Sequence, residues 1–303
     1  MSTANQIWNT VPAEYAIPAS APSLQDAYAY CERLARTHYE NFSVASWFLP
    51  KRLRQHFFNV YAYCRISDDL GDETGDCAAS LQLLDEWESE LNACYSGAPR
   101  HPVFVALAGT VREFDIPKHE FADLLTAFRQ DQTTTRYQTF EDLLGYCRYS
   151  ANPVGHLVLY LCGYRDPERQ QLSDFTCTAL QLANFWQDVS ADFAKGRIYL
   201  PLEDFQGYGV SADDIRDSKN TKQLREMMRF EVHRAREWFE RGLPLVGKVS
   251  RELAIDIELF SRGGQEILNA IERQGHAVLG NRPAISKGRK LTLVARAALH
   301  KLI

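Results

Sequence analysis

Apolar residues recur every three or four positions along most of the chain, which is the spacing of one face of an α-helix. No stretch of convincing length alternates apolar and polar residues as a strand would. The pattern predicts helices over residues 24–41, 51–72, 81–95, 103–114, 118–132, 139–164, 167–194, 221–241, 244–274 and 286–303. We therefore expect an all-α fold, with one helical domain over residues 23–303.

Proline and glycine mark the segments that interrupt this pattern. Residues 1–22 contain three prolines among small and polar residues, so we expect an irregular, partly mobile N-terminal segment. Pro201, Gly207 and Gly209 predict a loop. Gly155 predicts a bend or close packing within the helix that contains it.

The helix predicted over residues 167–194 carries one face of amides and carboxylates. The members of this face follow one another at steps of three, four and four residues: Gln181, Asn184, Asp188 and Asp192. Two aspartates four residues apart repel each other by about 0.2–0.5 kcal/mol even in solvent. Carboxylate oxygens suit Mg²⁺, which takes one or two carboxylates and leaves its other positions to water and phosphate. Two aspartates with this spacing more often form a solvated acidic face than a metal site. Whether they bind metal therefore depends on whether the chain contains a second pair of the same kind.

The helix predicted over residues 51–72 supplies such a second copy. Its polar face has steps of four, three and four residues: Tyr61, Arg65, Asp68 and Asp72. Asp69 adds a third carboxylate. The arginine of this face fits either a phosphate ligand or a structural ion pair with an aspartate.

A helical bundle can bring two acidic faces together across a central active-site cavity. Carboxylates there need compensation, because buried charges must be paired or bind metal. Metal ions and a diphosphate would provide it, and would stabilise the leaving group as a carbon–oxygen bond breaks. The pattern thus predicts ionisation of an allylic or similar diphosphate ester in an apolar, aromatic-lined pocket. The aromatic residues that fit this lining, or alternatively the plain core, are Phe42, Tyr146, Phe185 and Trp186.

Charge and composition narrow the class of protein and its location. The net charge of −5 gives no reason to expect a nucleic-acid partner. The seven cysteines show neither a CxxC pair nor zinc-site spacing, which favours reduced thiols and a cytoplasmic location. No apolar run reaches the roughly 18–20 residues of a membrane span. The basic, amphipathic tail from Asn281 fits either peripheral contact with the inner membrane surface or a closing helix with a solvated face.

The two acidic stretches resemble the paired aspartate motifs of the squalene/phytoene synthase family. Residues 61–72 are similar to its first motif, YAxCRxxDD with a trailing aspartate. Residues 181–192 are similar to its second motif, and GRIYLP follows at residues 196–201. Residues 146–155 resemble its YCxxxAxPVG segment. The likeness spans most of the chain, residues 38–289.

This resemblance implies the isoprenoid synthase fold and an Mg²⁺-dependent enzyme acting on an isoprenoid diphosphate. The implied metal ligands are Asp68, Asp72, Asp188 and Asp192. Tyr61 and Arg65 complete the implied catalytic set. The implied substrate-binding residues are His38, Phe42, Ser43, Asn184, Gln187, Arg197, Tyr199 and Arg282. Without the resemblance, Asn184 would fit a helix cap or a core hydrogen bond.

Within the family the resemblance extends to the hydroxysqualene synthases of bacterial hopanoid pathways. Residues 40–46, 150–155 and 184–189 carry it. It implies conversion of presqualene diphosphate and water to hydroxysqualene and diphosphate, without NADPH. Phytoene and dehydrosqualene synthases typically have arginine where this chain has Gln187, and a tyrosine often stands where it has Gly264. Both differences remove potential diphosphate partners and favour a substrate with a single diphosphate.

Two other functions stay open at this stage. The first is a squalene, dehydrosqualene or phytoene synthase that condenses two prenyl diphosphates. The second is a non-catalytic relative that serves as an assembly factor or a lipid-binding partner of pathway enzymes. The intact aspartates of both motifs count against the second function, because little other than metal chemistry would hold four carboxylates together.

Overall fold

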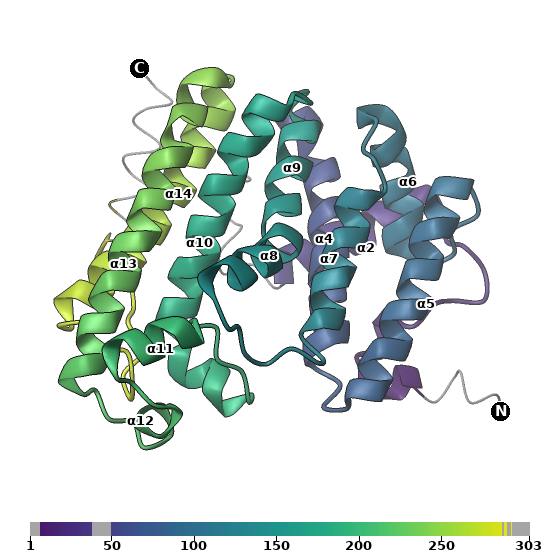
Figure 1. Ribbon diagram of the computed structural model, residues 1–303. Helices are drawn as coiled ribbons and strands as arrows, with labels where there is room; N and C mark the ends of the chain where they lie inside the picture. The colour runs from purple at the N-terminus through teal and green to yellow at the C-terminus, as the bar shows by residue number, and fades with distance from the viewer. Residues whose placement is uncertain (1–6, 38–49, 287, 290–291, 293–303) are drawn as a thin grey trace. The chain divides into compact units, whose positions relative to one another are not determined.

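The computed structural model describes residues 7–37, 50–286, 288–289 and 292. Every regular element among these residues is a helix (Figure 1), and a single isolated bridge joins Arg136 and Ile198. The prediction of an all-α fold is therefore confirmed. Unit 1 comprises the residues up to Thr133 with Pro153–Arg165, and unit 2 comprises Thr134–Asn152 with the residues from Asp166 onward. Each of these two compact units is described by itself.

Unit 1 is organised around helix α4. Its helices are α2 (Leu24–Thr37), α4 (Arg54–Asp72), α5 (Cys77–Ser96), α6 (Pro102–Phe114), α7 (His119–Gln130) and α9 (Asn152–Leu161). Short 3-10 turns occur at Trp8–Thr10, Ala13–Tyr15 and Lys51–Leu53. Helix α4 packs against α2, α5, α6 and α7, which can be followed in Figure 1. A helix with so many neighbours has its rotation fixed by its buried face.

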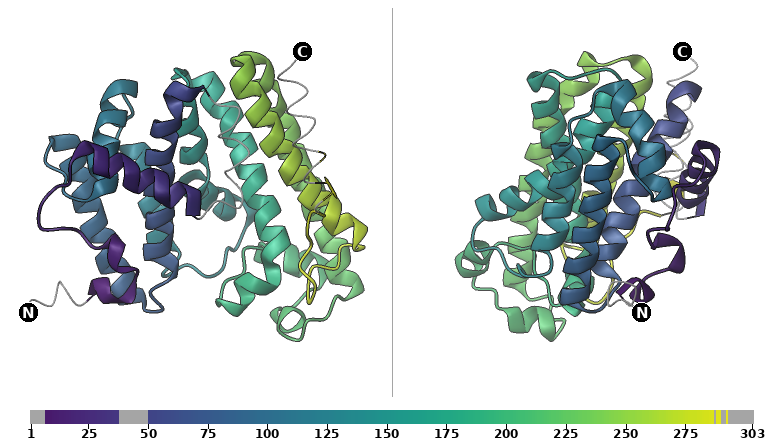
Figure 2. Two further views of the ribbon diagram at one scale, coloured as in Figure 1. Left: turned by 180° about the vertical axis from the view of Figure 1, so that it is seen from behind. Right: turned by 90° about the vertical axis from the view of Figure 1, so that its right-hand side faces the viewer.

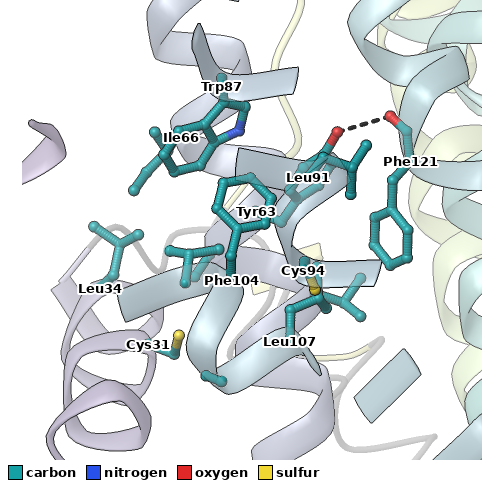
Figure 3. Packing of buried hydrophobic residues seen from close by; sticks show 14 of the residues in the cluster. Cys31, Leu34, Tyr63, Ile66, Trp87, Leu91, Cys94, Phe104, Leu107 and Phe121 are labelled. Atoms are coloured by element: carbon teal, nitrogen blue, oxygen red, sulfur yellow. Dashed lines mark hydrogen bonds between the residues drawn. The ribbon is translucent and has the colours of Figure 1, made fainter. Parts of the chain in front are cut away.

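The core of unit 1 holds that face of α4 through packed rings and hydrogen bonds, and Figure 3 shows the rings together with the hydrogen bond from Tyr63 to Phe121. The Tyr63 hydroxyl donates to the Phe121 carbonyl at 2.8 Å, and the Trp87 indole donates to Ser67 Oγ at 2.9 Å. The Trp87 and Phe104 ring centroids lie 4.5 Å apart. Because these α4 residues point into the core, Asp68 stands on its partly exposed side.

The described part of the N-terminal segment, residues 7–22, contains only short 3-10 turns, and its larger side chains nevertheless pack into unit 1. Trp8, Val11 and Tyr15 are buried. The Trp8 indole donates to Glu86 Oε2 at 2.8 Å. These contacts reach residues far along the chain, so the local pattern of prolines and polar residues contains no sign of them.

Unit 2 is organised around the long helix α10. Its helices are α8 (Phe140–Ser150), α10 (Pro167–Ala194), α11 (Leu202–Tyr208), α12 (Ala212–Arg216), α13 (Lys222–Gly242) and α14 (Arg251–Arg273), with a 3-10 turn at Leu243–Lys248. Figures 1 and 2 show α13 and α14 running beside α10, which they contact along their lengths. Glycine makes part of this approach possible, since a Cβ at Gly242 would clash with the Thr176 hydroxyl and lie 2.9 Å from the Thr176 nitrogen.

Three predicted boundaries are wrong. Residues 139–164 form two helices with a break at Ala151, because Pro153 lacks an amide hydrogen and disfavours a helical conformation just before it. Residues 201–209 form helix α11 after Pro201, and Gly209 ends it with φ 68°. Residues 244–274 begin as a 3-10 turn, and α14 starts only after the Ser250 cap.

The remaining predicted helices agree with the structure within a few residues at each end, and α10 agrees at both ends. The helix predicted over residues 24–41 begins as α2 does, at Leu24, and its last residues, 38–41, lie outside the described residues. Most of the helix predicted over residues 286–303 lies outside the described residues. Over the part of the chain that the structure describes, no helix has the length and apolar character needed to cross a membrane.

Replacing Tyr63 with phenylalanine should lower the free energy of unfolding by about 1–3 kcal/mol, because the Phe121 carbonyl would lose its partner away from water. Chemical denaturation followed by circular dichroism measures this change. Tyr95→Phe is the matched control, since the Tyr95 hydroxyl also donates to a backbone carbonyl at 2.8 Å, and the Tyr95 residue is 36% exposed whereas Tyr63 is fully buried. Its cost should stay below about 1 kcal/mol, because water can replace the hydroxyl. Equal costs for the two variants would contradict the assigned core.

Candidate active site

The aspartates of the first motif stand at the C-terminal end of α4. This helix ends at Asp72 and has no basic residue in its last turn. The partial negative charge of a helix C-terminus makes nearby carboxylates unfavourable by about 0.3–1 kcal/mol each. Compensation for these aspartates must therefore come from outside the last turn of the helix.

Neighbouring aspartates of this motif have different environments. Asp69 is 4% exposed and accepts hydrogen bonds from the Tyr15 hydroxyl at 2.7 Å and from Arg65 Nε at 3.0 Å, with a further bond from Arg65 Nη2. The Asp68 side chain is 50% exposed, and its Oδ2 lies 3.8 Å from Arg65 Nη1. Arg65 thus forms the structural ion pair that the sequence left as one of two alternatives, and Asp69 is the aspartate that it neutralises.

Arg65 and Tyr15 both keep their protons beside Asp69. Burial acts to lower the pKa of Arg65, but the carboxylates of Asp69 and Asp68 outweigh it, and the pKa is raised. Burial, followed by the hydrogen bond to Asp69, raises the pKa of Tyr15. Arg65 therefore stays charged and Tyr15 stays a donor. The local sequence gave no sign of Tyr15, which lies 54 positions before its partner.

The last turn of α4 is also held from neighbouring elements. The Gly71 carbonyl accepts from Gln132 Nε2 at 2.8 Å and from Ser80 Oγ at 3.2 Å. These donors satisfy a carbonyl that has no partner within the helix. Tyr61, two turns before Asp68, packs half-buried against the core of unit 1. The motif is thus presented on a rigid helix end.

The second motif stands near the C-terminal end of α10 in the same way. This helix ends at Ala194 and also lacks a basic residue in its last turn. Asp188 and Asp192 are partly exposed. Asn184 is exposed in the middle of the helix, which excludes the alternatives of a helix cap or a core hydrogen bond. Both motifs therefore place two carboxylates, four residues apart, in the last two turns of a helix, and the dipole opposes the charge of the one in the last turn, Asp72 in α4 and Asp192 in α10.

Arg282 supplies a cation to the second motif. It binds Asp188 through two hydrogen bonds, from Nε to Oδ1 and from Nη2 to Oδ2, the latter at 2.9 Å. Its Nη2 also donates to Gln187 Oε1 at 3.1 Å. The hydrogen bond to Asp188 raises the pKa of Arg282, so the guanidinium is charged. Gln187 is buried, and its Nε2 donates to the Pro283 carbonyl at 2.5 Å.

Four buried aromatic rings form a cluster in unit 2: Tyr137, Tyr146, Phe185 and Tyr199. Phe185 and Tyr199 stack with centroids 3.9 Å apart, and Tyr146 and Tyr137 lie 5.7 Å and 5.9 Å from Tyr199. Trp186 lies beside this cluster, with its ring centroid 6.5 Å from that of Phe185. It is fully buried and donates to the Glu231 carbonyl at 3.2 Å, so the core alternative holds for it.

Backbone pairing holds this aromatic cluster together. The Ile198 amide donates to the Thr135 carbonyl and the Leu202 amide donates to the Tyr137 carbonyl, each at 3.0 Å. The segment that follows the second motif, residues 196–202, is thereby fixed to the segment that carries Tyr137. Sequence reasoning missed Tyr137, and its place just before the Thr139 cap of α8 was the available signal.

The predicted site residues fall into three groups. Unit 1 carries Tyr61, Arg65, Asp68 and Asp72. Unit 2 carries Asn184, Gln187, Asp188, Asp192, Arg197, Tyr199 and Arg282. Three predicted residues lie outside the described residues, namely His38, Phe42 and Ser43. The structure therefore gathers each motif within its own unit.

The donor set fits a metal that also binds phosphate. Among the described residues, no three Asp, Glu, His or Cys side chains form a group that could hold a metal ion by itself. Each motif offers two carboxylates, which is the number that Mg²⁺ takes when water and a substrate phosphate supply its other ligands. A divalent metal carried by a diphosphate therefore suits these residues better than a protein cage would.

The comparison with known families decides the class of protein. A sequence profile described as squalene/phytoene synthase matches residues 35–289. The chain belongs to the squalene/phytoene synthase family. Enzymes of this family bind isoprenoid diphosphates and generally use a divalent metal. The protein is accordingly an isoprenoid synthase with the fold of that family.

Individual members of the squalene/phytoene synthase family are similar to this chain in sequence, and two of them also in structure. The crystal structure of squalene synthase HpnC from Alicyclobacillus acidocaldarius is 45% identical, with a TM-score of 0.80 over 89% of this chain and 98% of that one. A dehydrosqualene synthase crystallised with a ligand is 28% identical, with a TM-score of 0.83 over 92% and 98% of the two chains. The 15-cis-phytoene synthase of Synechocystis sp. is 30% identical over 90% of this chain and 86% of its own.

Exchanging single aspartates should separate the structural carboxylate from the functional one. Asp69→Asn should lower the free energy of unfolding by about 1–3 kcal/mol, because it leaves the half-buried Arg65 without its main partner. Asp68→Asn should change stability by less than about 1 kcal/mol, as expected for an exposed pair at 3.8 Å. Denaturant titration of both variants measures the difference, and a larger loss for Asp68→Asn would contradict the assignment.

Proposed function

We propose that the protein converts presqualene diphosphate and water to hydroxysqualene and diphosphate, with Mg²⁺, in hopanoid-type squalene biosynthesis. The carbon–oxygen bond breaks and its electron pair leaves with the diphosphate. The cyclopropylcarbinyl cation rearranges, the oxygen of water bonds to the product cation, and a proton is lost. No reductant enters this balance, so NADPH is not required.

The similarity to squalene synthase HpnC, at 45% identity, supports the hopanoid-type, squalene-related part of the proposal. Two positions in unit 2 support a substrate with one diphosphate. Gln187 is buried, and both ends of its amide are hydrogen-bonded to residues 282 and 283. Gly264 packs so closely that a Cβ would lie 2.5 Å from Phe239 Cζ and 2.8 Å from Leu180 Cδ2. Neither position presents a group for a second diphosphate.

We assign the metal to the carboxylates of both motifs: Asp68, Asp72, Asp188 and Asp192. The metal, when bound, would neutralise charge on the diphosphate leaving group. Arg282 and Arg197 would bind phosphate oxygens as charged donors, and Asn184 would act as a neutral one. Arg65, committed to Asp69, would contribute by holding the helix end that carries Asp68.

The aromatic cluster of unit 2 supports carbocation chemistry. Ring faces attract cations, and the four rings of the cluster are held away from water. We propose that Tyr146, Phe185 and Tyr199 contribute faces toward a cationic intermediate, with Tyr137 holding Tyr199 in place. An apolar environment also limits where water can reach the cation.

Condensation of two prenyl diphosphates is the second candidate, because phytoene synthases such as that of Synechocystis sp. are about 30% identical over most of the chain. Product analysis separates the candidates. The purified protein is incubated with Mg²⁺ and either presqualene diphosphate or farnesyl diphosphate, without NADPH, and the products are identified by mass spectrometry. We expect hydroxysqualene from presqualene diphosphate and no product from farnesyl diphosphate. Turnover of farnesyl diphosphate alone would overturn the proposal, and no turnover of either would favour a non-catalytic relative.

Asp188→Asn should reduce kcat/KM for presqualene diphosphate by at least about a hundredfold, because an amide is a poor metal ligand and cannot neutralise the cation. Removal of the metal with EDTA should abolish turnover by the unaltered protein. Glu168→Gln is the matched control, since Glu168 is an exposed carboxylate on the same helix and pairs with Lys248. The control should retain its activity. Unchanged turnover by Asp188→Asn would remove this aspartate from the metal site.

A further inference from the structure

Arg282 occupies the carboxylate that the proposed metal would need. Its guanidinium takes both oxygens of Asp188 by hydrogen bonds. The Arg282 side chain is 59% exposed and the Asp188 side chain 26% exposed, so the pair is open to solvent and can exchange. A guanidinium fits a carboxylate in this two-bond manner better than any other side chain does.

A metal ion and this guanidinium cannot both have full use of Asp188. Mg²⁺ binds carboxylate oxygens at about 2.0–2.1 Å with near-octahedral demands, whereas the guanidinium already covers both oxygens. The two cations would also repel each other across a single carboxylate. Binding of metal at Asp188 therefore requires that Arg282 withdraw at least in part.

Gln187 fixes where the guanidinium stands. Its Oε1 accepts from Arg282 Nη2 at 3.1 Å, while its Nε2 donates to the carbonyl of the next residue, Pro283, at 2.5 Å. Gln187 is 7% exposed, so its amide has a defined orientation in the packed interior of unit 2. One neutral side chain thus holds both the guanidinium of Arg282 beside Asp188 and the backbone of the following residue, Pro283.

We propose that Arg282 and the metal compete for Asp188, and that Gln187 is the positioning residue that keeps Arg282 in this competition. Without metal, Arg282 neutralises the carboxylate at the end of α10. When metal arrives with a diphosphate, the phosphate oxygens offer the guanidinium another anion, and Asp188 becomes available. Metal alone is therefore bound weakly and metal with diphosphate strongly. The inference rests on the proposed function for the identity of the two ligands.

The test uses Mn²⁺ as the probe and the full chain without any diphosphate. Electron paramagnetic resonance of free Mn²⁺ gives the dissociation constant. We expect Arg282→Gln to bind Mn²⁺ about two- to fivefold more tightly than the unaltered protein, which is the range of a partly exposed ion pair. Arg262→Gln is the matched control, because Arg262 also donates from Nε and Nη2 to one carboxylate, that of Glu258. It removes the same charge and should leave Mn²⁺ binding unchanged.

The opposite result should appear with inorganic pyrophosphate. In the presence of Mn²⁺, calorimetry should show weaker pyrophosphate binding by Arg282→Gln than by the unaltered protein, because the released arginine is no longer available. Gln187→Met keeps the side-chain volume and the net charge, and it should also tighten the binding of Mn²⁺ alone. A structural role by itself would not produce this tightening. If Gln187→Met does not fold, as judged by its thermal melt, the Arg282 and Arg262 variants still decide the competition.

Two results would overturn the inference. One is an equal change, or no change, in Mn²⁺ affinity for the Arg282 and Arg262 variants. The other is the absence of Mn²⁺ binding in both the unaltered protein and Arg282→Gln. The proposed function fails separately, through lack of turnover of presqualene diphosphate, and that failure leaves the Mn²⁺ titrations unaffected.

Discussion

Negative charge at the C-terminal ends of two helices is the constraint on which the candidate site depends. The last turns of α4 and α10 carry aspartates and no basic residue, although the helix dipole favours cations there. In each unit an arginine pairs with one of the motif's carboxylates. In unit 1, Arg65 neutralises the buried Asp69 from the same helix, and in unit 2, Arg282 reaches Asp188 from a distant segment.

The two arginines differ in how firmly they are held. Arg65 and Tyr15 enclose Asp69 in the interior, so this pair belongs to the folded structure. Arg282 is largely exposed and its pair with Asp188 is open to solvent. Exposed pairs contribute less than about 1 kcal/mol, which a metal or a diphosphate can readily exceed. The permanent pair therefore shapes the helix end, whereas the exchangeable pair can take part in binding.

Much of the fold and the identity of both motifs could be predicted from sequence, because both depend on local periodicity. Helix α10 was predicted at both ends, since Pro167 suits a first helical position and the acidic face keeps its spacing up to the end. The break at Ala151 was missed because the periodicity continues across it, and Pro153 acts only on the backbone.

The different roles of adjacent residues could not be predicted, because they depend on contacts between distant segments. Asp68 and Asp69 look alike in sequence, yet one step of about 100° around the helix turns Asp69 toward Tyr15. From the sequence, Gln187 was interpreted only as the loss of an arginine that could bind a second diphosphate. In the structure it is an anchor for Arg282 and Pro283, a role that only the folded chain reveals.

The central claim is that the two carboxylates of the second motif, Asp188 and Asp192, serve one metal-bound diphosphate. The most direct measurement is a double-mutant cycle on the binding of inorganic pyrophosphate in the presence of Mg²⁺, with Asp188→Asn, Asp192→Asn and the variant with both changes. Residues that act on one ligand as a unit give non-additive effects. We predict that either single change removes most of the affinity and that the second change adds little. Additive losses, or a loss from only one of the two aspartates, would contradict the claim.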